Sequence, residues 1–138
     1  MSINSSGEIA GWLNNSRGVF GFVRAADGII AEFDVEGLHQ TFAVAINDGG
    51  IIAGYTNNAA FIRAFDGTVN LFKSPSGGPI QALSINGAAA AAGYWVDAQK
   101  ITHGFVRSSD GSFTSFDAPN QGGGLNPGTY ALSINEGP

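Results

Sequence analysis

The sequence contains no cysteine and few charged residues. Without cysteine, disulfide bridges, thiolate catalysis and Cys-ligated zinc are excluded. Charged residues make up 12% of the chain, roughly half the share that is usual in soluble domains. The six lysines and arginines form no basic run, and the formal net charge is −5. We therefore expect no nucleic-acid partner, because binding to a phosphate backbone requires clustered basic residues.

Long apolar runs and recognised catalytic motifs are also missing. No apolar stretch of the sequence approaches the roughly 20 residues of a membrane helix, and the N-terminal residues lack the cationic and apolar segments of a signal peptide. There is no Gly-x-Ser-x-Gly elbow, no P-loop or dinucleotide fingerprint and no Asp-rich calcium loop. His39 and His103 occupy unrelated places in the sequence. We expect no membrane insertion, no signal peptide in this chain, no metal site and no cofactor.

Glycine, by contrast, is abundant, with 21 of 138 residues, and hydrophobic residues make up 43%. A chain of this length fits one domain that buries about two-thirds of its unfolded surface. Glycine-rich chains with little charge and scattered aromatic residues are typical of folds with many short strands and turns. The composition therefore predicts an all-β domain.

A repeat runs through the chain. Its clearest element is an Ile-Asn pair, followed by a turn and then by Ala-Gly and an aromatic residue. The period is roughly 40–50 residues, the size of one supersecondary unit in a repeat protein. We predict one domain over residues 1–138, with units at 2–45, 46–84 and 85–133 and the start of a fourth unit at 134–138. The asparagines of the pair, which we expect to form turns, are Asn4, Asn47, Asn86 and Asn135.

Each unit is expected to contain four antiparallel strands. In the first unit, short apolar runs cut by Asn, Asp-Gly and Gly-Gly predict strands near 8–13, 19–24, 29–33 and 41–46. An Asp-Gly pair follows a Phe-x-Arg element in every unit and predicts a hairpin with a type I′ turn. The alanine-rich run 88–92 has helical propensity, but its position in the repeat predicts that it belongs to the strand that ends in Gly-Tyr.

This pattern resembles the HAF family of bacterial extracellular repeats. The resemblance rests on Ile-Asn-x-x-Gly-x-Ile-Ala-Gly-Tyr, Gly-Phe-Val-Arg and Phe-x-x-Phe-Asp-x-Pro, and residues 102–105 and 113–119 match most closely. It covers nearly the whole chain and implies secreted β-repeat proteins of propeller type, without implying a reaction. Ala60, Lys73 and the turn at 87–92 depart from the pattern, which argues against a strictly threefold site.

Two ways of closing the fold stay open. Units of this size are propeller-type blades, but propellers typically need four to eight of them. We therefore expect a second chain to complete a six-bladed propeller, as a homodimer or another homo-oligomer. The alternative is a β-trefoil, in which three four-stranded units close as a monomer.

Aromatic residues end the first predicted strand of each unit, at Trp12, Tyr55 and Tyr94. They are candidates for stacking on sugar rings, or else they pack between units, because aromatic side chains supply the largest buried areas. Trp95 occurs in one unit alone, and we expect it to be an exposed aromatic residue and a further ligand-binding candidate.

Arginines recur at one position of the repeat, as Arg24, Arg63 and Arg107. They are candidates for lining a pocket or central channel and binding an anion through the planar guanidinium. The alternative is a structural contact with the neighbouring unit.

These observations favour a non-enzymatic extracellular binding module, most concretely a lectin-like module that binds carbohydrate. The first alternative is a purely structural repeat that completes an oligomeric propeller, and the second is a small hydrolase with a site at the channel mouth. The expected partners are further copies of the chain and glycans, and the expected secreted location rests on the family resemblance.

Overall fold

The computed structural model describes residues 1–119 and 128–136, and within these ranges all the regular structure is β-strand. No helix in the described ranges is long and apolar enough to cross a membrane. Twelve strands form three sheets of four, and in each sheet the strands follow in sequence order and pair antiparallel. This confirms the predicted all-β class and the three four-stranded units.

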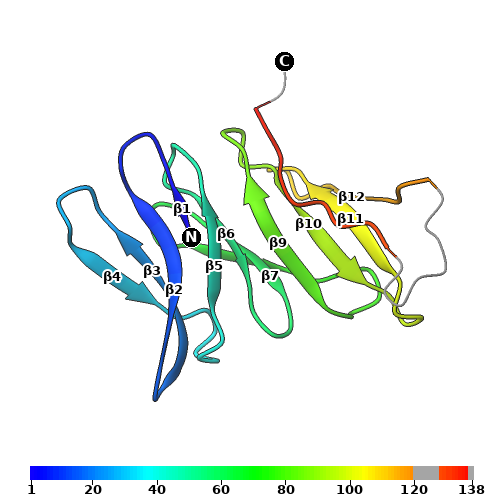
Figure 1. The fold of residues 1–138 in the computed structure, drawn as a ribbon, viewed down its shortest axis with the longest axis horizontal. Helices are drawn as coiled ribbons and strands as arrows, with labels where there is room; N and C mark the ends of the chain where they lie inside the picture. Colours follow the sequence, from blue (N-terminus) through cyan, green and yellow to red (C-terminus); the bar gives the residue numbers. More distant parts are fainter. Residues whose placement is uncertain (120–127, 137–138) are drawn as a thin grey trace.

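We call the three sheets blades 1, 2 and 3 in chain order. They lie side by side, with blade 2 in the middle (Figure 1). Blade 1 contains β1 (Ser2–Ile3), β2 (Ile9–Asn15), β3 (Gly18–Arg24) and β4 (Ile30–Phe33). Blade 2 contains β5 (Phe42–Ile46), β6 (Ile52–Tyr55), β7 (Ala60–Arg63) and β8 (Val69–Phe72). Blade 3 contains β9 (Ile80–Ile85), β10 (Ala91–Val96), β11 (Thr102–Arg107) and β12 (Phe113–Phe116). Three separate sheets do not make the barrel of a β-trefoil, so that alternative is wrong.

The sheets are offset by one strand from the predicted units. The run 41–46, expected as the fourth strand of the first unit, forms β5, the first strand of blade 2. The predicted units 2–45 and 46–84 therefore each end in a strand of the next sheet. The physical reason is that a repeat in the sequence determines the period but not the strand at which a sheet begins.

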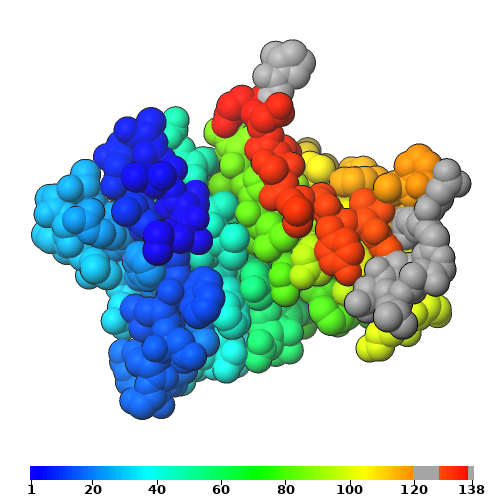
Figure 2. Space-filling model, in the orientation of Figure 1, coloured from blue at the N-terminus to red at the C-terminus, as the bar shows by residue number. Residues whose placement is uncertain are grey.

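Residues 129–134 extend this arrangement beyond blade 3. The backbone N–H of Ile134 donates to Ser84 Oγ at 2.9 Å, just as the N–H of Ile46 in blade 2 donates to Ser2 Oγ in blade 1 at 3.3 Å. The segment thus lies on blade 3 as the first strand of each blade lies on the blade before it. Figure 2 shows this segment as the red atoms that cover part of blade 3.

The hydrophobic core lies between the sheets. One buried cluster joins blades 1 and 2, and a second joins blades 2 and 3. Phe61 in the first cluster and Phe105 in the second have no exposed surface, and burial of such a side chain contributes about 1.5–3 kcal/mol. The remaining buried members include Ala10, Ala43, Ile46 and Ile52 in the first cluster and Ala53, Ala60, Ile80, Ala82, Ile85, Ala91 and Trp95 in the second.

The glycine of the repeated Ala-Gly-aromatic element allows two strands to approach closely. A Cβ atom on Gly54 would collide with the carbonyl oxygen of Phe42, and one on Gly93 would collide with that of Gln81. The pairing register shifts at the same place in both blades, as it does at a β-bulge. A side chain at these glycines would therefore separate the first two strands of the blade.

The predicted Asp-Gly hairpins are present in all three blades, but the expected type I′ turn is wrong. That turn requires positive φ at both central residues, whereas only the glycine has positive φ here, for example Gly28 at 95°. The Asp27 carboxylate instead accepts the N–H of Ile29, two residues on, at 3.0 Å. Asp66 and Asp110 make the same bond to Thr68 and Ser112.

The repeated asparagines hold the blades together. Asn47 Oδ1 accepts the N–H of Ile51 within its own turn, and Asn47 Nδ2 donates to the carbonyl oxygen of Asn86 in blade 3, both at 2.9 Å. Asn4 Nδ2 donates to the carbonyl oxygen of Asn47 at 3.1 Å, and Asn86 Nδ2 donates to that of Asn135 at 3.1 Å. We call this series, Asn4, Asn47, Asn86 and Asn135, the asparagine clamp. Its turn-forming role was predicted from the sequence, and its inter-blade role was not.

Replacement of Asn47 by Asp separates the two roles. Asn47→Asp keeps an acceptor for Ile51 but places a carboxylate oxygen against the carbonyl oxygen of Asn86. We expect the free energy of unfolding to fall by about 1–3 kcal/mol, the cost of leaving a buried polar group unpaired. Urea denaturation measures this. The exposed Asn70→Asp variant is the control, with an expected change within about 0.5 kcal/mol; equal losses in both variants would contradict the inter-blade role.

The alanine-rich run does not form a helix, as predicted, but only its last two residues belong to a strand. β10 begins at Ala91, and the turn before it contains one strained residue. Ala89 has φ of 62°, where the equivalent residues of the other blades are Gly7 at 80° and Gly50 at 72°. A Cβ atom disfavours this left-handed conformation by about 1–2 kcal/mol.

Ala89→Gly should therefore stabilise the chain. The removal of backbone strain is partly offset by the greater conformational freedom of glycine in the unfolded state. It is also offset by the loss of the contact between the Ala89 methyl group and the core between blades 2 and 3. We expect a net gain of about 0.5–1 kcal/mol in unfolding free energy. The neighbouring Ala88→Gly, at an exposed residue without positive φ, should lower it, and a loss in both variants would show that Ala89 is not strained.

Candidate functional site

Aromatic side chains form a row along the ends of the first two strands of the blades. Trp12 meets Phe42 with ring centroids 5.4 Å apart, and Phe42 stacks on Tyr55 at 5.0 Å with an angle of 13° between the rings. Farther along, Tyr94 meets Tyr130 at 4.9 Å. We call these five residues the aromatic row. Of the predicted candidates, Trp12 and Tyr55 both contact Phe42, and Tyr94 belongs to the separate pair with Tyr130.

The two ends of the row are its most accessible parts. Trp12 and Tyr130 are each 47% exposed, whereas the three residues between them are half-buried. Burial raises the pKa of Tyr55 and of Tyr94, and the neighbouring phenols of Tyr55 and Tyr130 raise that of Tyr94 further. The phenol groups of Tyr55 and Tyr94 therefore stay protonated at neutral pH and are available as hydrogen-bond partners; Tyr94 Oη already donates to Gln81 Oε1 at 2.8 Å.

Phe42 and Tyr130 belong to the row but were not predicted. Both lie four residues before the isoleucine of the Ile-Asn pair, where the middle repeat has Gln81. Their common place in the repeat is visible in the sequence and could have identified them. To use it, however, one must know that this run pairs with the strand ending in Trp or Tyr, as Phe42 pairs with Tyr55.

A small polar pocket opens near the row. Its lining begins two residues beyond Tyr55, and its volume is about 300 Å³. Two asparagine amides and one ammonium group, all from blade 2 loops, supply hydrogen-bond donors there. The lining residues are Asn57, Asn58, Lys73, Gly77, Gly78 and Pro79.

Trp95 is not an exposed aromatic residue, so this expectation is wrong. Trp95 is 9% exposed and belongs to the core between blades 2 and 3. Its Nε1 donates to Ser115 Oγ at 3.0 Å, and its ring stacks on His103 with centroids 4.5 Å apart. Successive residues of a strand point to opposite faces of the sheet. Tyr94 and Trp95 therefore lie on opposite faces of β10 and cannot bind one ligand together.

Two of the three repeated arginines lie between blades rather than together in one pocket. The Arg63 guanidinium lies over the ring of Phe33 in blade 1 at 4.7 Å, and that of Arg107 lies over Phe72 in blade 2 at 4.8 Å. Arg24, in blade 1, is half-buried and lies near Gly28 of its own hairpin. These positions correspond to the structural alternative for the repeated arginines.

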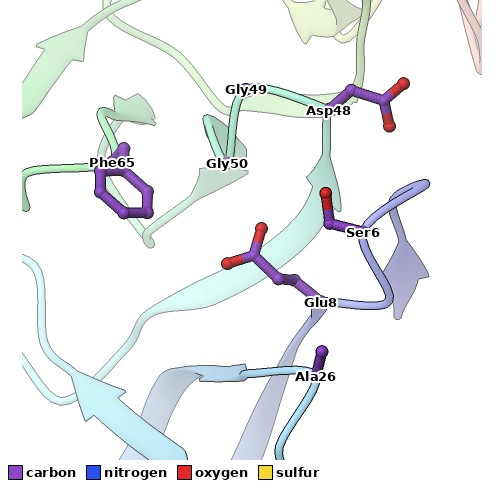
Figure 3. Close-up of a pocket in the computed structure, with 7 residues that line it drawn as sticks. All are labelled: Ser6, Glu8, Ala26, Asp48, Gly49, Gly50 and Phe65. Atoms are coloured by element: carbon purple, nitrogen blue, oxygen red, sulfur yellow. The ribbon is translucent and has the colours of Figure 1, made fainter.

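A larger pocket of about 500 Å³ lies between blades 1 and 2, at the opposite ends of the strands from the row. Figure 3 shows the Glu8 side chain pointing toward the middle of this pocket, with Ser6 on one side and Phe65 on the other. The two carboxylates that line this pocket already accept hydrogen bonds from the asparagine clamp and its turn. Glu8 Oε2 accepts from Asn4 Nδ2, and Asp48 Oδ1 accepts the N–H of Ser5, both at 2.8 Å. The bond from Ser5 lowers the pKa of Asp48. Among the described residues, no group of three or more His, Cys, Asp or Glu side chains could hold a metal ion.

His103 lies between two carboxylates in blade 3. Its Nε2 is 3.0 Å from Asp97 Oδ2, and its Nδ1 is 2.6 Å from Asp117 Oδ1. The bond to Asp97, together with the bond to Asp117 and the charges of both groups, outweighs burial and raises the pKa of His103. Since both ring nitrogens are engaged, His103 has no nitrogen left to activate a serine hydroxyl.

The comparisons with known proteins bear on the fold alone. No family model matches the chain, and no curated protein does, so the resemblance to the HAF family stays a prediction. Among solved structures, a streptogramin B lyase structure is similar at 17% sequence identity and a TM-score of 0.52. That protein is a β-propeller, so the three sheets are propeller-type blades. The likeness covers 84% of this chain and 43% of the other, so this chain spans less than half the length of the propeller it matches.

The raised pKa of His103 predicts a pH dependence of stability. A group whose pKa is raised by folding stabilises the fold below its unfolded pKa, and this contribution is lost as the pH rises through the folded pKa. We therefore expect the melting temperature to fall as the pH rises above about 6.5, the ordinary pKa of histidine, and to fall less steeply in His103→Gln. Scanning calorimetry across this range checks it; equally steep slopes in both proteins would contradict the role of His103.

Proposed function

We propose that the chain is a non-enzymatic binding module that binds carbohydrate at the aromatic row. The observation that supports this most is the row itself, with Trp12 and Tyr130 half-exposed at its ends. Monomeric proteins seldom leave large aromatic side chains gathered at the surface without a binding role. A sugar ring offers an apolar C–H face to an aromatic ring and hydroxyl groups to polar neighbours.

The polar pocket beside the row supplies the second half of this recognition. Asn57 and Asn58 are exposed, and each amide group carries both a donor and an acceptor. The Lys73 ammonium adds three donors. A pocket of about 300 Å³ is at the small end of the range for ligand sites, which suits one or two sugar rings rather than a long chain. The proposed extracellular location rests on the resemblance to the HAF family.

Two other functions compete with this proposal. A purely structural repeat would need no ligand, and a flat response on a broad glycan array would favour it. A hydrolase would need an activated nucleophile, and the engagement of both His103 nitrogens argues against that residue as its base. A screen of ester and glycoside substrates separates this third function from the first two.

Substitution at the ends of the row tests the proposal directly. We expect Trp12→Ala and Tyr130→Ala each to weaken binding of array-selected glycans roughly tenfold, the equivalent of about 1.4 kcal/mol, as measured by titration calorimetry. Phe65→Ala is the matched control, because Phe65 is an exposed aromatic residue outside the row. Circular dichroism shows whether each variant is folded. Absence of glycan binding by the unmodified chain, or binding untouched by both substitutions, would contradict the proposal.

A further inference from the structure

The two contacts between neighbouring blades are built in the same way. At the first, Phe33 on β4 meets Phe61 of blade 2 edge to face, with centroids 6.2 Å apart, and the Arg63 guanidinium covers the Phe33 ring at 4.7 Å. At the second, Phe72 on β8 meets Phe105 of blade 3 at 5.9 Å, and Arg107 covers the Phe72 ring at 4.8 Å. Each contact thus joins a phenylalanine on the last strand of one blade to a Phe-x-Arg element on the third strand of the next.

The outer blades each carry one half of this contact without its counterpart. Blade 3 has the phenylalanine on its last strand, and blade 1 has the Phe-x-Arg element on its third strand. Phe116 on β12 corresponds to Phe33 and Phe72 and is 42% exposed. Phe22 and Arg24 on β3 correspond to the Phe-x-Arg elements of the other blades and are only half-buried, although the equivalent Phe61 and Phe105 are fully buried. Blades 1 and 3 lie at opposite ends of the molecule (Figure 1), so the two halves cannot meet within one copy.

The first strand of blade 1 is also shorter than those of the other two blades, with two residues against five in β5 and six in β9. β1 pairs with β2 at two positions, Ser2 with Ala10 and Ile3 with Ile9, whereas β5 also pairs Phe42 with Tyr55. Within the described residues, no strand residue pairs with Trp12 on the side of β2 that faces β1, the place that Phe42 takes beside Tyr55 in blade 2. The segment 129–134 has the length to do so, and its last two residues form with Asn135 the same Ser-Ile-Asn triplet as residues 2–4.

We propose that a second copy of this chain docks head to tail on the first. Phe116 of one copy packs against Phe22 and Arg24 of the other, which reproduces the contact between blades 1 and 2. Residues 129–134 stay on blade 3 of their own copy and take the place of Ser2–Ile3 beside β2 of the other copy. Since the contact is heterologous, it is repeated until a ring closes; two copies supply six blades, within the four to eight of known propellers.

A charge exchange at this contact tests the proposal, with light scattering on a sizing column as the measurement. The unmodified chain should have the mass of a dimer. Phe116→Lys places a cation against Arg24, and Arg24→Glu removes the cation over Phe116, so each variant should weaken dimerisation at least tenfold. The double variant pairs Lys with Glu across the contact and should regain part of the dimer. Phe65→Lys and Lys100→Glu are the matched controls, at exposed positions outside the contact, and should remain dimeric.

A cross-link keeps the proposal testable even if these variants unfold. The chain has no cysteine, so Trp12→Cys and Tyr130→Cys in one chain introduce the two thiols needed. If Tyr130 faces Trp12 as Phe42 faces Tyr55, oxidised glutathione should join two copies, because directly opposed strand residues lie within disulfide range. The pair Trp12→Cys and Phe65→Cys should not form this cross-link.

The outcomes are distinct and need no glycan. Because the dimer places Tyr130 of one copy opposite Trp12 of the other, the masses of Trp12→Ala and Tyr130→Ala on the same column separate loss of the dimer from loss of glycan binding. A dimer that the charge exchange disrupts and the double variant restores supports the proposal, as does the specific cross-link. A monomer at all concentrations, a dimer indifferent to Phe116 and Arg24, or open polymers without a two-copy ring would each overturn it.

Discussion

The arrangement of the three blades depends on the asparagine clamp. The side chains of Asn4, Asn47 and Asn86 use their oxygen to close the turn of their own blade and their nitrogen to donate to the backbone of the next asparagine in the series. An amide can do both because it carries a donor and an acceptor on one short side chain. Neither Asp nor Ser could replace it: aspartate has no donor, and a hydroxyl group is too short to span two blades. One residue type therefore couples the local turn to the packing of the sheets.

The clamp also explains the small side chains near it. Strands held this close leave room for alanine and glycine on the first two strands of each blade, as Ala43, Ala53 and Gly54 show. Larger groups pack between the blades on the third and fourth strands, where the phenylalanine–arginine contacts lie.

Much of this fold is encoded in local signals that a single sequence displays. Short apolar runs, Asp-Gly turns and the Phe-x-Arg element predicted the strands, the hairpins and the number of units. The sequence did not reveal at which strand each sheet begins, nor that Trp95 is buried. Both depend on which strands pair or pack with one another, and local patterns carry no such information. The turn type was missed for a similar reason, since Asp-Gly suits several turns and the geometry of the flanking strands decides between them. Of the aromatic row, Trp12, Tyr55 and Tyr94 were candidates from the sequence, whereas Phe42 and Tyr130 required the pairing.

Several departures from the repeat lie along the aromatic row and in the polar pocket beside it. The clamp asparagines and the phenylalanines of the Phe-x-Arg elements are present in each blade, so the scaffold is nearly symmetric. The row is not: its first members are Trp12 and Phe42, Gln81 interrupts the aromatic positions, and Tyr130 follows Tyr94. Lys73 adds a cation to the polar pocket, at a position where the other blades have aspartate. A symmetric scaffold needs identical residues at its contacts, whereas the strand ends are free to differ, and those differences would set the specificity of any ligand held along the row.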